Sequence, residues 1–253
     1  MKRREFCKST LAAAVAGSIP GRHLMAGGIP YMSGVSASVS AVTASGSETS
    51  LGMATVKDLQ DSLRGDLLLN GDGGYDNARA VWNAMIDKHP ALIARCEGAM
   101  DVVNSINFAR DNSLLVAVRG GGHSISGKSV CEGGLMIDMS QMNTVRVDKK
   151  ATTARADGGC LEGHIDREAS LHGLATTGGV VSHTGAAGLT LGGGYGRLCR
   201  KYALACDNLI GADIVTADGV FRHVDANENA DLLWALKGGG GNFGVVTALE
   251  YQL

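Results

Sequence analysis

Glycine clusters are the feature that most constrains this chain. Of its 253 residues, 37 are glycine, about twice the usual share of roughly 7%. Many of them gather at residues 119–127, 177–196 and 238–244. Consecutive glycines leave backbone N–H groups free to converge on an anion such as a pyrophosphate, and they let a flat ring lie close to the backbone. The clusters therefore predict tight turns around a bound ligand.

The remaining composition narrows the class of protein. Only three residues are proline, which argues against a collagen-like or a Pro/Gly-rich disordered chain. A hydrophobic content of 45% is enough to bury a core. The 23 basic and 25 acidic residues give a net charge of −2, so the basic excess typical of nucleic-acid binding is missing. We expect a globular protein that does not bind nucleic acid.

The N-terminus has the pattern of a twin-arginine export signal. Arg3 and Arg4 precede a weakly apolar run at residues 9–19, which is too short to span a bilayer. We assign residues 1–44 to this signal and a linker, the linker pattern covering residues 31–50, with cleavage after Ala41 or Ala44. The mature protein would then be periplasmic or extracellular, without a membrane span. A basic N-terminus with a chance arginine pair is the alternative.

Six cysteines are present, but they form no Cys-x-x-Cys motif and no zinc-finger spacing accompanies them, so we predict no metal site. Cys7 lies in the predicted signal, which leaves five. One disulfide could form after export, and the sequence does not determine its pairing.

Hydrophobic periodicity predicts strands and helices in an α+β order. We expect strands at residues 91–94, 114–118, 135–138, 144–147 and 245–253, and helices at residues 99–110, 160–172 and 227–237. Residues 212–216 and 220–224 flank an Asp-Gly turn and predict a hairpin. Asn227 is the expected helix cap, and the buried face of the 160–172 helix would carry Leu161, Ile165, Ala169 and Leu171. No doubly wound β-α-β series emerges.

A dinucleotide-binding fingerprint must be tested because Gly239, Gly241 and Gly244 match G-x-G-x-x-G. That motif requires a strand before the glycines and a helix after them. Here a predicted helix comes before and a predicted strand after, so we reject it. No phosphate-binding P-loop sequence occurs either.

Three strings together resemble a known family. They are VAVRGGGHS at 116–124, GLTLGGGYG at 188–196 and WALKGGGGNFG at 234–244. In this order they resemble the FAD-linked oxidases with a PCMH-type (vanillyl-alcohol-oxidase-type) FAD-binding domain, most of all the berberine-bridge-enzyme and 6-hydroxynicotine-oxidase branch. The resemblance implies a domain of two α+β subdomains at residues 75–253, with a core from about residue 87, after an N-terminal extension at 45–74.

The resemblance also implies a cofactor, FAD, and its binding residues. Residues 119–124 match the loop around the pyrophosphate, and His123 matches the histidine that bonds covalently to the flavin 8α carbon. The implied cofactor-binding residues are Arg119, Gly120, Gly121, Gly122, His123, Ser124, Gly127, Thr177, Gly178, Gly179, Ser182, His183, Gly185, Gly188, Gly193, Gly194, Tyr195, Gly196 and Val215.

Several of these assignments have a plain structural alternative. His123 could be a capping or core histidine, and His183 could be an ordinary loop residue, so we assign His183 no acid–base role. Tyr195 could equally be a packed side chain. Val215 would act through the backbone of residues 213–216 near the adenine. Trp234 and Phe243 are expected in the core.

Attachment through a second residue is not expected. Some berberine-type members add a bond from a cysteine, but Val181 stands at the matching position here. We therefore predict a single covalent link, through His123.

Full-length relatives continue into a substrate domain that usually supplies the catalytic base, whereas this sequence stops near the expected end of the FAD domain. We expect the substrate domain to be absent and leave the catalytic residue unassigned. A complete oxidase of this kind would oxidise a small alcohol, sugar or amine by hydride transfer to the flavin, with dioxygen as acceptor. The alternatives are a truncated FAD-binding module without activity, or a glycine-rich binding protein without cofactor.

Overall fold

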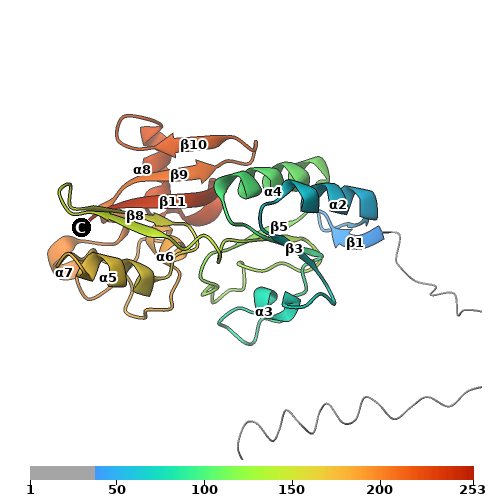
Figure 1. Cartoon of the computed structure of the whole chain (residues 1–253), viewed down its shortest axis with the longest axis horizontal. Helices are drawn as coiled ribbons and strands as arrows, with labels where there is room; N and C mark the ends of the chain where they lie inside the picture. Colours follow the sequence, from blue (N-terminus) through green and yellow to red (C-terminus); the bar gives the residue numbers. More distant parts are fainter. Residues whose placement is uncertain (1–37) are drawn as a thin grey trace, which may run out of the picture. The chain divides into compact units, whose positions relative to one another are not determined.

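The structure, a computed structural model, describes residues 38–253 (Figure 1). The predicted twin-arginine motif and residues 31–37 of the predicted linker lie outside the described residues. The described residues form a four-stranded sheet, a five-stranded sheet and a two-stranded hairpin, and none of the helices among them is long and apolar enough to span a membrane. The α+β prediction is confirmed.

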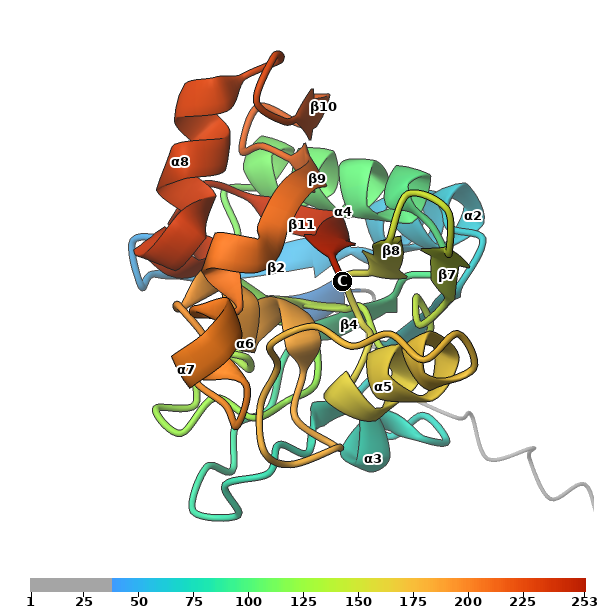
Figure 2. The ribbon, with the colours of Figure 1, turned by 90° about the vertical axis from the view of Figure 1, so that its left-hand side faces the viewer.

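The first sheet has four strands, three of them parallel. Their spatial order is β3 (Asp66–Leu69), β4 (Leu92–Arg95), β6 (Leu135–Asp138) and β5 (Val116–Arg119), with β3 antiparallel to β4. Helices cover both faces: α2 (Met53–Ser62) and α4 (Ala99–Asp111) lie side by side over one, and α3 (Tyr75–Arg79) lies against the other (Figure 2). Parallel strands buried on both faces explain why residues 135–138 read as one apolar run.

The second sheet has five antiparallel strands. Their order is β10 (Phe221–Val224), β9 (Leu209–Val215), β11 (Val245–Gln252), β8 (Thr153–Asp157) and β7 (Val145–Asp148). Its core packs against α5 (Glu162–Ser170), α6 (Ala186–Leu191) and α8 (Ala230–Gly239). Helix α4 joins the two halves, because it also contacts β9 and β11, whose Val215 and Val245 belong to the core of the first half. Short helices α7 (Cys199–Tyr202), η1 (Cys206–Asn208) and η2 (Gly240–Asn242) complete the fold.

The predicted linker is wrong for its second part. Residues 38–52 form a hairpin of β1 (Ser38–Val42) and β2 (Glu48–Gly52), and Ala41 and Leu51 are buried in the first core. The Val42 N–H donates to the Gly133 carbonyl at 2.7 Å, which ties β1 to the body. Alternating serine and small apolar residues look like a linker in sequence, but they suit a half-buried strand. Cleavage after Ala41 would cut β1 itself, and cleavage after Ala44 would separate β1 from β2.

The other predicted elements are largely confirmed, with shifted ends. Helix α8 begins after Asn229, which takes a left-handed conformation, and not after Asn227. The 160–172 helix is shorter than predicted, so Leu171 lies beyond it and is exposed. Strand β8 and helix α6 were not predicted, because small alanines carry their buried positions. The domain boundary at residue 75 stays a prediction, although residues 38–74 share the first core.

Candidate functional site

The three glycine clusters meet around one cavity of about 610 Å³. This volume lies within the range of small-molecule sites. The cavity is lined by Val116, Ala117, Val118, Gly120, Gly121, Gly122, His123, Ser124, Lys128, Ser129, Thr184, Gly185, Gly188, Leu189, Gly241 and Asn242. The continuous apolar run at residues 114–118 is typical of a buried strand, yet Val116 and Val118 of β5 are partly exposed because they face this cavity.

The first cluster forms a loop directly after β5. In the described part of the chain, the backbone N–H groups of residues 120–123 donate to no other protein atom. Gly122 has a φ of 69°, which favours glycine. Free N–H groups on such a loop form an anion-binding concavity.

A buried aspartate anchors the base of this loop. Asp138 on β6 is 1% exposed, and its Oδ1 accepts from the Arg119 guanidinium at 3.2 Å. The backbone N–H and the hydroxyl of Ser140 also donate to this carboxylate, at 3.1 and 3.0 Å. The Arg119 Nε is buried and has no partner among the described residues. Asp138 thus positions the Arg119 side chain, whose Nε–H remains without an acceptor among the described residues.

The first and second clusters touch backbone to backbone. A Cβ added at Gly121 would lie 2.3 Å from the Gly185 Cα, and one added at Gly185 would lie 2.5 Å from the Gly121 nitrogen. Neither position leaves room for a side chain. This contact sets the loop after β5 against the start of α6.

The second cluster also folds back on itself. A Cβ at Gly196 would lie 1.7 Å from the Gly178 carbonyl oxygen. Beneath Gly178 and Gly179 lies Glu162, a carboxyl group only 4% exposed. Burial raises the pKa of Glu162 to about 7, although the Gly179 N–H donates to it and opposes the shift. Tyr251, also buried, shares a hydrogen bond with Thr190 of α6 at 2.8 Å.

Other glycines border open space, and together with the polar groups beside them they show whether the cavity could hold FAD. Gly188 and Gly241 line the cavity, and a Cβ at either would meet nothing within 4 Å. Ser129, also lining the cavity, has a buried hydroxyl without a partner among the described residues. Free N–H groups, a spare hydroxyl and bare backbone suit a pyrophosphate and a flat ring. The residues present therefore fit FAD.

His123 stands where this cavity adjoins a second one of about 430 Å³, because it lines both. Its Nε2 lies 2.7 Å from the Nδ1 of His183. Trp82 stacks on the His123 ring with centroids 5.4 Å apart and planes 18° apart. Burial, and then the neighbouring His183, lower the pKa of His123, which keeps the imidazole neutral near pH 7.

Residues 82–88, which include Trp82, are hydrogen-bonded to the glycine loop at residues 122–127. The Trp82 N–H donates to the Gly122 carbonyl at 2.9 Å, and the Asn83 side chain donates to the Ile125 carbonyl at 2.9 Å. The Lys88 ammonium donates to the Gly127 carbonyl at 3.1 Å. Four separate segments of sequence therefore converge on His123: this one, its own loop, the His183 loop and the start of α5, whose Leu161 and His164 line the second cavity.

About half of the predicted site residues line one of the two cavities. These are Arg119, Gly120, Gly121, Gly122, His123, Ser124, His183, Gly185 and Gly188. The others are placed elsewhere: Gly127, Thr177, Gly178, Gly179, Ser182, Gly193, Gly194, Tyr195, Gly196 and Val215. Val215 is buried in the core inside β9, and Tyr195 is 75% exposed. Gly196 and Gly178 serve chain packing, as shown above, and their role toward a cofactor stays a prediction.

Sequence reasoning missed several residues around the cavities. They include Trp82, Ser129, Ser140, Asn143, Leu161, His164 and Asn242. Trp82 lies in a segment with no periodic pattern, and Asp138, which anchors Arg119, reads as the end of a buried strand. A buried charge directly after an apolar run was the one available signal. Trp234, expected in the core, is 79% exposed.

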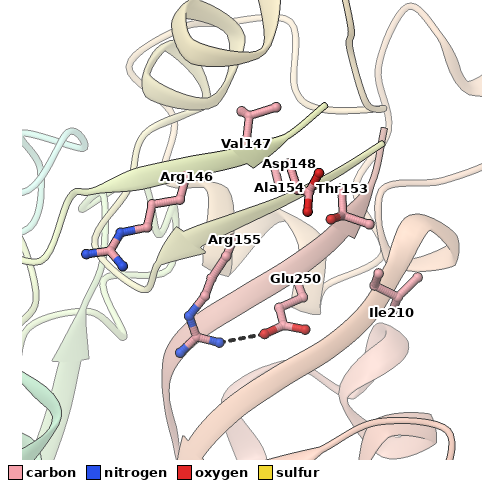
Figure 3. A pocket seen from close by; sticks show the side chains of 8 residues that line it. All are labelled: Arg146, Val147, Asp148, Thr153, Ala154, Arg155, Ile210 and Glu250. Atoms are coloured by element: carbon pink, nitrogen blue, oxygen red, sulfur yellow. Dashed lines mark hydrogen bonds and ion pairs between the residues drawn. The ribbon is translucent and has the colours of Figure 1, made fainter. Parts of the chain in front are cut away.

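A third groove lies on the open face of the five-stranded sheet and carries none of the glycine clusters (Figure 3). In Figure 3 the Arg155 side chain on β8 points toward Glu250 on β11, and the two are joined at 2.7 Å. Arg155 also pairs with Asp213, to which His223 bonds at 2.7 Å. This network satisfies its own charges and holds neighbouring strands together. The Asp213 carboxylate therefore has partners within the protein and does not require a ligand.

All five cysteines in the described part of the chain are free thiols. Cys199 accepts a hydrogen bond from the Gly196 N–H at 3.0 Å and so supports the turn after α6. Burial raises the pKa of the Cys131 thiol to about 11. The disulfide that the sequence left open is not formed among these residues.

A glycine-lined cleft with free backbone donors, next to a neutral histidine, defines a protein that binds a nucleotide-type cofactor. Comparison with known proteins gives the family. Residues 90–225 match the model of the FAD binding domain. The chain belongs to the FAD-linked oxidoreductases with a PCMH-type FAD-binding domain.

Two curated relatives illustrate the match. The chain is 41% identical over 192 residues to (R)-6-hydroxynicotine oxidase of Paenarthrobacter nicotinovorans, which covers 76% of this chain and 42% of the relative. It is 38% identical over 199 residues to an FAD-linked oxidoreductase of Dictyostelium discoideum, which covers 78% and 44%. The chain therefore spans less than half the length of these relatives.

Solved structures of FAD-dependent oxidases also support this family assignment. The 6-hydroxy-D-nicotine oxidase of Arthrobacter nicotinovorans superposes with a TM-score of 0.74 at 40% identity, covering 76% of this chain and 42% of that one. Glucooligosaccharide oxidase of Acremonium strictum gives 0.74 at 31% identity, covering 78% and 42%, and that protein carries a 6-S-cysteinyl, 8α-N1-histidyl FAD. FAD is thus the cofactor of the family to which this chain belongs.

Proposed function

We propose that this chain is the FAD-holding part of an oxidase, and that it binds FAD covalently through His123 alone. The observation that carries the proposal is the position of His123. It follows the glycine loop, lines both cavities, and is held between Trp82 and His183. A neutral imidazole with one free nitrogen is a nucleophile suited to covalent attachment.

Different residues of the cavity would bind different parts of the cofactor. The free N–H groups of residues 120–123 would bind the pyrophosphate, and the partnerless Ser129 hydroxyl would donate to the same ligand. Gly188 and Gly241 would let the cofactor lie against bare backbone. When bound, FAD supplies the two-electron redox chemistry, while the protein supplies binding, orientation and electrostatics.

Attachment through one residue follows from the sequence around the second cluster. Val181 stands where some relatives have the second attaching residue, a cysteine. Cys199, the cysteine closest in sequence to the last glycines of this cluster, holds the Gly196 turn. None of the five described cysteines lines either cavity. The two-point linkage of glucooligosaccharide oxidase would therefore not form here.

The relatives indicate the class of reaction that the complete enzyme would catalyse. We expect oxidation of a small alcohol, sugar or amine with dioxygen as the electron acceptor, in keeping with relatives named as hydroxynicotine, chitooligosaccharide and glucooligosaccharide oxidases. The catalytic base would come from sequence that matches the remaining part of those relatives. Export by the twin-arginine route remains our expectation for localisation.

Acid denaturation tests the covalent assignment directly. The full chain is expressed with FAD, precipitated in acid, and examined by in-gel fluorescence and intact mass. We expect flavin to stay with the polypeptide, and to be lost on denaturation from His123→Ala. His172→Ala, an exposed histidine at the end of α5, is the matched control and should keep the label. Complete release of flavin from the unchanged chain would refute covalent attachment.

A further inference from the structure

The two ring nitrogens of His123 have different surroundings. Nε2 lies 2.7 Å from the His183 Nδ1. Trp82 stacks against the face of the ring, so it occupies neither nitrogen. The His123 Nδ1 makes no hydrogen bond within the described part of the chain. Of the two nitrogens, Nδ1 is therefore the one available to react.

The loop that carries His183 is fixed on both sides of it. The Gly163 N–H donates to the Ser182 carbonyl at 2.8 Å, and the Glu162 N–H donates to the Thr184 carbonyl at 2.9 Å. Both bonds tie the loop to the first turn of α5. The backbone of His183 is thus held in place, while its side chain is exposed and can exchange protons with water.

From this geometry we infer that His183 is a positioning residue for flavin attachment: its Nδ1 accepts the Nε2–H of His123, selects the tautomer whose Nδ1 carries the lone pair, and takes the proton when Nδ1 forms the bond. The inference rests on the proposed covalent link through His123. It adds to that link the group that prepares His123 and the choice of Nδ1 as the nitrogen of this histidine that bonds to the 8α carbon.

His123 Nδ1 forms a bond to the 8α carbon, one C–H bond of the 8α methyl group breaks, and the N–H bond at Nε2 breaks. Two electrons pass to the ring system and two protons are released, one of them to His183. Dioxygen then takes up two electrons and two protons and becomes hydrogen peroxide.

Without an acceptor at Nε2, the imidazole would carry a positive charge as the new bond forms. Besides His183, the ionisable side chains that line the two cavities beside His123 are Arg119, His164 and Lys128, and the Lys128 ammonium has no acceptor site. Arg119 cannot accept a proton. His164 already accepts from the Leu161 N–H through its Nδ1 at 3.2 Å, and it makes no hydrogen bond to His123. His183 is the group placed to neutralise the charge.

The test measures attachment, not turnover. Full-length apo chain, made in riboflavin-deficient cells, is mixed with FAD, and covalent incorporation is followed by in-gel fluorescence after acid denaturation. Reversible FAD binding is measured separately by fluorescence quenching at early times. For His183→Ala we expect incorporation at least tenfold slower, with reversible affinity changed by less than threefold. Added imidazole should restore much of the rate, which a merely structural loss would not permit.

Two further variants complete the design. His183→Asn keeps a hydrogen-bond acceptor near the Nδ1 position but not a basic group, so it should also incorporate slowly, and it carries the test if His183→Ala does not fold. His172→Ala should label at the unchanged rate. Incorporation by both His183 variants at the unchanged rate, or slow incorporation that imidazole does not restore in His183→Ala, would overturn the inference. If the unchanged chain itself never labels, the proposed covalent function fails instead.

Discussion

Two groups of glycines in this molecule serve opposite purposes. The packed glycines, Gly121, Gly185 and Gly196, sit where backbones cross, and a Cβ at any of them would overlap backbone atoms of another segment. The open glycines, Gly188 and Gly241, border the cavity, and a Cβ there would meet no protein atom. The packed glycines allow two backbone segments to touch, whereas the open glycines leave space for a ligand in the cavity. The residue type is the same in both groups, so only the atoms around each glycine show whether it serves packing or binding.

Gly121→Ala should give the largest effect. The new Cβ would lie 2.3 Å from the Gly185 Cα, and backbone atoms on both sides cannot move aside as a flexible side chain can. We expect the free energy of unfolding to fall by at least about 3 kcal/mol. Urea denaturation measures this change. An unchanged midpoint would show that the two clusters do not pack as described.

Glu162 should make stability fall with rising pH. Its pKa is about 7 in the folded chain against an ordinary 4.5, so between these values the folded state holds a proton that the unfolded state has released. The stabilisation is complete below about pH 4.5, declines up to about pH 7 and is then lost, a change of about 3 kcal/mol. It follows that Gly178 and Gly179 lie against a carboxyl group whose protonated form stabilises the fold.

Urea denaturation of the unchanged chain and of Glu162→Gln across pH 4.5 to 8 isolates this effect from other titrating groups. The glutamine keeps an acceptor for the Gly179 N–H. We expect the variant to gain about 3 kcal/mol relative to the unchanged chain as the pH rises. Parallel curves for the two proteins would mean that Glu162 ionises normally.

Gly188→Ala is the matched counterpart of Gly121→Ala. Gly188 lies in α6 with open space around it, so the new methyl group should leave the fold intact, and alanine favours a helix over glycine by about 1 kcal/mol. The same methyl group would occupy the cavity. We expect reversible FAD affinity to fall about tenfold, or about 1.4 kcal/mol, measured by fluorescence quenching. Unchanged affinity would place the cofactor away from α6.

Trp82→Ala should have the smallest effect of the four. Trp82 is 59% exposed, and its main side-chain contact is the stack on His123. Such ring pairs contribute about 1 kcal/mol. We expect a loss of that size in the free energy of unfolding, and slower flavin incorporation because the His123 ring is held less firmly. Trp82→Phe retains a stacking ring and should recover most of both. A Trp82→Ala chain that labels as fast as the unchanged one would limit the role of Trp82 to packing.

Much of the fold could be predicted because its signals are local. The strands at residues 91–94 and 135–138, helix α4 and the β9–β10 hairpin follow from apolar runs, helical spacing and an Asp-Gly turn. The structure also agrees with our rejection of the dinucleotide-binding fingerprint, because helix α8 comes before Gly240 and strand β11 comes after Gly244. Three of the elements that were missed, β1, β8 and α6, bury alanine and other small residues, whose contribution to a periodic pattern is weak. Helices α2 and α3 and strand β3 were missed as well, although they bury larger side chains.

For the site, the sequence alone determined which residues could approach a cofactor. Consecutive glycines directly after a strand are local facts of chain chemistry and predicted a bound anion and a flat ring, whereas the resemblance of three sequence strings to a family implied FAD and the role of His123. Only the tertiary structure decided which glycines pack and which stay open, and that Trp82 and His183, 41 and 60 residues away in sequence, bracket His123. The physical reason is that a contact between distant segments depends on where two sheets and their helices place the backbone, which no local pattern encodes.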